Sequence, residues 1–85
     1  QGEYEKALEW YEKGLAIQLK TVGPDHPSTA TSYNNMAVLC YNMEEYKKSL
    51  EYFEMALNII LKSLGPSHPH VTSMQQAIEV VKQKL

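Results

Sequence analysis

The pentapeptide Gly23-Pro24-Asp25-His26-Pro27 recurs as Gly65-Pro66-Ser67-His68-Pro69, 42 residues further along the chain. All four prolines and two of the four glycines lie in these two stretches. Glycine favours the residue just after a helix, and proline is tolerated at the first position of the next helix. Each pentapeptide is therefore predicted to end one helix and to begin another.

Apolar residues recur at three- and four-residue steps throughout the rest of the chain, a spacing that predicts helices with one apolar face. No glycine or proline marks the boundary at residues 43–45, but the phase of the apolar pattern changes there, so we expect a short turn. The four expected helices are Glu3–Val22, Pro27 or Ser28 to Asn42, Glu44–Leu64 and Pro69–Leu85.

Two residues compete to cap the second helix. Asp25 has the better chemistry for an N-cap, but Pro27 at the first helical position makes His26 the formal cap residue. Both remain candidates at this point.

The chain repeats itself well beyond the two pentapeptides. When the sequence is shifted by 42 residues, 15 of 43 aligned pairs are identical, without any gap. The identical pairs include Tyr4/Tyr46, Leu8/Leu50, Leu15/Leu57, Ile17/Ile59 and Val38/Val80. A fixed period of this length is typical of a solenoid built from repeated helical units.

The residues within the period resemble the tetratricopeptide repeat. Residues 33–57 contain Tyr33-x-x-Met36-Ala37-x-x-Cys40 followed by Glu44-x-Tyr46-x-x-Ser49-x-x-x-Phe53-x-x-Ala56-Leu57. The usual repeat has about 34 residues. The longer period, the lengthened second helix and the G-P-x-H-P linker resemble the variant found in kinesin light chains.

The resemblance implies an all-α fold of antiparallel helix-turn-helix repeats, a right-handed α-solenoid segment of four helices. Each repeat would pair a helix A with a helix B, so the order here would be B-A-B-A. Residues 1–22 would be a helix B without its partner, 28–64 one complete repeat, and 69–85 a helix A or a capping helix. The chain would then be a piece of a longer array that begins in mid-repeat.

Composition argues against several classes of partner. The net charge is −2, all eight basic residues are lysines, and the pI is about 5.9, so nucleic acid and anionic membranes are not expected partners. No apolar run approaches the length of a membrane span. The single cysteine excludes an internal disulfide, and we expect a cytoplasmic protein.

Candidate chemical groups have simpler structural interpretations. His26 and His68 recur with the period, which favours capping and packing over metal binding. His68-x-His70 could chelate a metal with Cys40 as a further ligand, but a structural zinc site needs four ligands. Cys40 occupies a core position of the repeat motif. Without a phosphate loop or a catalytic serine motif, we expect no enzyme activity and no cofactor.

The resemblance also implies a binding groove. Helices A of the family line a concave groove for extended peptides, and Asn35 matches an asparagine that hydrogen-bonds the bound peptide. The residues expected to flank Asn35 are Thr31, Asn34, Val38, Tyr41 and Asn42. The alternative is that Asn34 and Asn35 are simply polar surface residues.

Two departures from the family pattern modify this expectation. Val38 and Asn42 stand where carboxylate-binding members carry lysine or arginine, so a carboxylate clamp is not expected. In the last helix Glu79 stands at the position that Ala37 has in the second helix, which favours a capping or divergent helix over a full wall of the groove.

The predicted function is a non-catalytic scaffold or adaptor module that binds a protein, as a peptide or a helix, in this groove. The alternative is a structural role, in which repeats stack or the chain forms a homo-oligomer through the unpaired first helix. The face expected to mediate it comprises Tyr4, Leu8, Tyr11 and Leu15. A weaker alternative is a regulatory segment of a larger enzyme.

Overall fold

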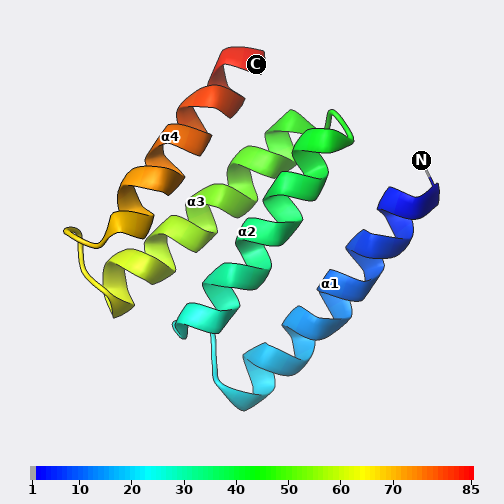
Figure 1. The fold of residues 1–85 in the computed structure, drawn as a ribbon. Helices are drawn as coiled ribbons and strands as arrows, with labels where there is room; N and C mark the ends of the chain where they lie inside the picture. Colours follow the sequence, from blue (N-terminus) through cyan, green and yellow to red (C-terminus); the bar gives the residue numbers. More distant parts are fainter. Residues whose placement is uncertain (1) are drawn as a thin grey trace.

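A computed structural model describes residues 2–85, and these residues form four α-helices and no strand. The helices are α1 (Gly2–Thr21), α2 (Pro27–Asn42), α3 (Tyr46–Ser63) and α4 (Pro69–Lys84). They lie side by side in chain order, each antiparallel to the next, in a flat molecule of 36 × 32 × 15 Å (Figure 1). The predicted all-α helical-repeat fold is therefore confirmed. Of the described helices, none is long and apolar enough to cross a membrane.

Most helix ends lie where the sequence predicts them, but α3 begins two residues later than expected. Glu44 has a positive φ of 63°, the left-handed conformation that ends a helix. The Glu45 N–H then donates to the Cys40 carbonyl at 2.8 Å, and that of Glu44 to the Tyr41 carbonyl at 3.0 Å. These two bonds close α2, so Glu44 and Glu45 belong to the turn rather than to α3.

The two repeated linkers end the long helices in the same way. Gly23 and Gly65 have φ values of +90° and +91°, which a residue with a Cβ atom rarely adopts. Their N–H groups donate to the carbonyls five residues earlier, those of Gln18 and Ile60, at 3.0 and 3.1 Å. Glycine at these positions is therefore required by the backbone of the turn.

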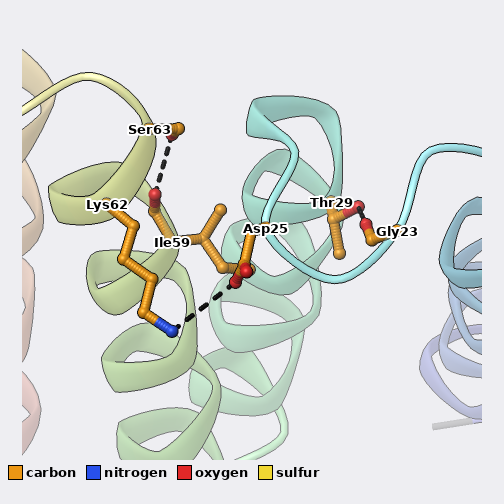
Figure 2. Close-up of polar contacts among 6 residues, drawn as sticks. All are labelled: Gly23, Asp25, Thr29, Ile59, Lys62 and Ser63. Atoms are coloured by element: carbon orange, nitrogen blue, oxygen red, sulfur yellow. Dashed lines mark hydrogen bonds and ion pairs between the residues drawn. The ribbon is translucent and has the colours of Figure 1, made fainter.

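Histidine caps both helices that follow the linkers. The Nδ1 atom of His26 accepts a hydrogen bond from the Ser28 N–H at 3.1 Å, and Nδ1 of His68 accepts from the His70 N–H at 3.2 Å. His26, and not Asp25, is thus the N-cap of α2. The Asp25 carboxylate instead lies 3.7 Å from Lys62 Nζ at the end of α3 (Figure 2). Both side chains of this ion pair are mostly exposed, so it contributes little stability.

Helix α2 is buried on two sides, because it lies between α1 and α3. One stripe consists of Thr29, Ser32, Met36 and Leu39, and hydrogen bonds from Thr29 and Ser32 lead toward α1 and its linker. The other stripe consists of Ala30, Tyr33, Ala37 and Cys40, and it packs on α3. Small residues in the second stripe allow α2 and α3 to make the most extensive contact of the fold.

The contact between α1 and α2 contains several polar interactions. The Gln18 side chain donates to the Ser28 carbonyl at 3.3 Å and accepts a hydrogen bond from the Ser32 hydroxyl. The buried Thr29 hydroxyl donates to the Gly23 carbonyl at 2.9 Å (Figure 2). These hydrogen bonds make the α1–α2 contact partly polar.

The corresponding contact between α3 and α4 is apolar. We call two residues that lie 42 positions apart counterparts. Ile60 is the counterpart of Gln18, and Val71 is the counterpart of Thr29. Both are buried in one cluster of the core, which joins α2, α3 and α4. The backbone is therefore repeated at the two linkers, but hydrogen bonds join the helices at the first linker and apolar packing joins them at the second.

Candidate functional site

The seam between α2 and α4 is hollowed at two places. The first hollow, of about 270 Å³, lies near the N-terminal ends of these helices. It is lined by Pro27, Thr31 and Asn34 of α2, Ile60 of α3, the C-cap residue Leu64, and His70, Ser73 and Met74 of α4. Its lining therefore combines hydroxyl, amide and imidazole groups with apolar side chains.

The second hollow, of about 190 Å³, lies further along the same two helices and has an apolar lining. It is formed by Val38, Tyr41, Phe53, Ala77, Val80 and Val81. The Tyr41 ring meets the Tyr46 ring edge to face at 5.3 Å, which fixes its orientation. Because α2 and α4 run in the same direction (Figure 1), the polar and the apolar hollow follow one another along a single seam.

The structure brings four of the six predicted groove residues to this seam. Thr31 and Asn34 line the polar hollow, and Val38 and Tyr41 line the apolar one. Asn35 is exposed and lines neither hollow. Asn42 lies at a separate depression beside the start of α1 and the turn at 43–45.

The α4 side of the seam was not named from the sequence, although the repeat contains the signal. Val80 is the identical counterpart of Val38, and the two are exposed to similar degrees, 48% and 45%. Ser73 is the counterpart of Thr31, and both line the polar hollow. Counterparts of the predicted α2 residues would therefore have identified these two residues.

Comparison with known protein families agrees with this architecture. The family profile described as "Tetratricopeptide repeat" matches residues 1–62, which include α1, α2 and nearly all of α3. The chain belongs to the tetratricopeptide repeat family. Repeats of this family typically serve as non-catalytic protein-protein interaction modules. A comparison with curated proteins finds no match to this sequence.

Cys40 is a packing residue of this tetratricopeptide repeat. Its side chain is fully buried between α2 and α3. Burial raises the pKa of the thiol, Glu45 and Glu12 raise it further, and Lys48 opposes them. A buried thiol with a raised pKa is protonated and unreactive at neutral pH, which agrees with the interpretation from the motif.

The linker histidines of the repeat act through their ring nitrogens as helix caps, as described above. The rings of His68 and His70 are stacked, with their centres 4.9 Å apart and their planes 5° apart. Among residues 2–85, no group of three or more His, Cys, Asp or Glu side chains is placed to hold a metal ion.

The four residues predicted as a self-association face do not share one environment in this tetratricopeptide repeat. Tyr4 and Tyr11 are 40% and 38% exposed. Leu8 and Leu15 are half-buried, and the helix against which α1 packs is α2. The more exposed apolar side chains of α1 are Trp10 and Ile17, at 75% and 62%.

Proposed function

We propose that this chain is a scaffold or adaptor module that binds an extended peptide along the seam between α2 and α4. The observation that carries the proposal is the succession of a polar hollow and an apolar hollow on the same pair of helices. Amide and hydroxyl groups suit a peptide backbone because they offer both donors and acceptors. An apolar pocket of side-chain size suits one anchoring residue.

The lining of the seam defines the kind of peptide. Asn34 and Thr31 would contact the peptide backbone, and an aliphatic or aromatic side chain would occupy the hollow between Val38 and Val80. None of the described residues lining the two hollows is a lysine, aspartate or glutamate. An uncharged apolar anchor therefore suits this seam better than an acidic motif or a terminal carboxylate, both of which need cationic partners.

Selection from a library of random linear peptides displayed on phage tests the proposal. Selected peptides should share one large apolar residue, and the Val80→Glu variant should lose them because a carboxylate would then occupy the apolar hollow. Asn34→Ala should weaken the same peptides by roughly tenfold, the expected loss from one or two hydrogen bonds.

Met55→Glu is the matched control, since Met55 is a similarly exposed apolar residue on α3 and lines neither hollow. This variant should retain the selected peptides. Peptides that bind the Val80→Glu and Asn34→Ala variants as well as the original chain would refute binding at this seam.

A further inference from the structure

The two hollows of the seam repeat one arrangement of lining positions. Each of the six residues that line the apolar hollow lies seven positions from a residue that lines the polar hollow. On α2 the pairs are Thr31 with Val38 and Asn34 with Tyr41, and on α4 they include Ser73 with Val80. Seven residues are almost two full turns of an α-helix, so both members of a pair lie on nearly the same side of their helix.

This offset fixes the distance between the two hollows. Seven residues at about 1.5 Å each correspond to about 10.5 Å along the seam. Helix α3 runs in the opposite direction and shows the same offset in reverse, because Ile60 lines the polar hollow and Phe53 lines the apolar one (Figure 1). A ligand that fills both hollows must therefore present two side chains on one face at about this separation.

The separation distinguishes between backbone conformations of the ligand. Side chains of a β-strand alternate between two faces at about 3.3 Å per residue, so those on one face lie about 6.6 or 13 Å apart. A polyproline II helix has three residues per turn, and its residues i and i+3 lie on one face about 9.3 Å apart. An α-helix places residues i and i+7 on one face about 10.5 Å apart. The spacing thus favours polyproline II or an α-helix over a strand.

The chemistry of the polar hollow favours polyproline II over an α-helix. Thr31, Asn34 and Ser73 bring hydroxyl and amide groups to this hollow. An α-helix uses most of its backbone N–H and C=O groups internally, whereas a polyproline II backbone has no internal hydrogen bonds and leaves its carbonyls free for such donors. The polar hollow is also larger than the apolar one, about 270 against 190 Å³, so it has room for a side chain beside the backbone.

We propose that the ligand of the seam is a peptide in the polyproline II conformation, with an uncharged hydrogen-bonding side chain and a large apolar side chain three residues apart. The first side chain enters the polar hollow, and the second lies between Val38 and Val80. An uncharged pair matches the seam because its described lining contains no lysine, aspartate or glutamate. The inference rests on the proposed function, since it specifies the ligand of the same seam.

Nine-residue oligoproline peptides test the spacing, because proline-rich chains adopt polyproline II in water. Each peptide carries one glutamine and one leucine, separated by two, three or four positions, in either order. The two orders represent the two directions in which a peptide can run along the seam. In one order, the i, i+3 peptide should bind at least about tenfold more tightly than the other two, because the other spacings turn one side chain about 120° away. Fluorescence anisotropy of an N-terminal label measures the affinities.

Protein variants assign the two contacts. In Val80→Glu the three spacings should bind equally weakly, because leucine no longer enters the apolar hollow. In Asn34→Ala the preference for i, i+3 should decrease, because glutamine loses a partner while leucine still binds. Met55→Glu places the same charge at a similarly exposed position of α3 that lines neither hollow, and it should keep the full preference.

The inference and the proposed function fail in different ways. Equal affinities of the three spacings, tighter binding of a two- or four-residue spacing, or no binding of any oligoproline peptide would overturn the inference. Binding of a peptide at the seam would still stand as long as Val80→Glu loses the phage-selected peptides. If those peptides instead share a polar and an apolar residue seven positions apart, an α-helix is the ligand and the inference is wrong. Selected peptides that do not depend on Val80 would refute the proposed function itself.

Discussion

The Ser49 hydroxyl of α3 donates a 2.7 Å hydrogen bond to the Ala37 carbonyl of α2, and both residues are fully buried. This bond joins the two helices of the complete repeat within a contact that contains the fully buried small residues Ala37, Ser49 and Ala56. It also explains why a polar residue is tolerated within the α2–α3 contact, since the hydroxyl has a partner there.

Removing this bond should destabilise the repeat. We expect Ser49→Ala to lower the free energy of unfolding by about 1 kcal/mol, because a buried hydrogen bond is lost without a change of shape. Ser63→Ala is the matched control. The Ser63 hydroxyl also bonds a carbonyl at 2.7 Å, that of Ile59, but within its own exposed helix end (Figure 2). Urea unfolding should show little change for Ser63→Ala, and equal losses in both variants would contradict this assignment.

The histidine caps can be tested by changing the acceptor. His26→Ala should lower the free energy of unfolding by about 1 kcal/mol, since the Ser28 N–H loses its side-chain partner. His26→Asp should retain the stability, because a carboxylate accepts the same hydrogen bond and favours a helix N-terminus. His70→Ala, which removes only a stacked ring, is the control for a general effect of histidine loss. Thermal unfolding of the three variants separates these outcomes.

Two glycines should respond in opposite directions to the same substitution. Gly65→Ala should destabilise the chain by about 1–2 kcal/mol, because φ is +91° and a Cβ atom disfavours the left-handed backbone. Gly14→Ala should stabilise it by about 0.5–1 kcal/mol, because Gly14 lies inside α1 with open space around its Cα. Melting temperatures that move in the same direction would be inconsistent with this geometry.

Cys40 should make the fold sensitive to alkaline pH. Burial raises the pKa of its thiol in the folded chain. At a pH between the pKa of the thiol in the unfolded chain and its pKa in the folded chain, the unfolded chain therefore binds fewer protons. Stability is therefore expected to fall as the pH rises above about 8.5, where an exposed thiol ionises. Cys40→Ala should remove this part of the pH dependence, and a thiol reagent should modify Cys40 only as fast as the chain unfolds. Rapid modification of the folded chain would disprove burial of the thiol.

The sequence predicts the fold well because the linkers have strong chemical signals. Glycine and proline locate four of the helix boundaries, and the period predicts the rest of the arrangement. The start of α3 was predicted too early because Glu44 adopts a left-handed conformation that glutamate rarely takes. The cap at His26 depends on the direction of one ring nitrogen, which composition does not indicate.

The candidate site was less predictable than the fold. Thr31, Asn34, Val38 and Tyr41 lie on the seam, but helix periodicity does not show which flank of a helix faces its neighbour. The sequence alone consequently did not show that Asn35 is exposed and lines neither hollow. The role of Asn35 in binding and the cytoplasmic location both stay predictions.

The polar contact of Gln18 with Ser28 and Ser32 also has a consequence for cooperativity. The α1–α2 contact combines a few hydrogen bonds with the apolar side chains Met36 and Leu39, and α1 itself has no buried residue, whereas α2, α3 and α4 share an apolar core. Segments with few buried apolar contacts open with a smaller free energy than the rest of a protein. The amides of α1 should consequently exchange with solvent through a local opening that leaves the other three helices intact, so the chain is expected to unfold in two steps.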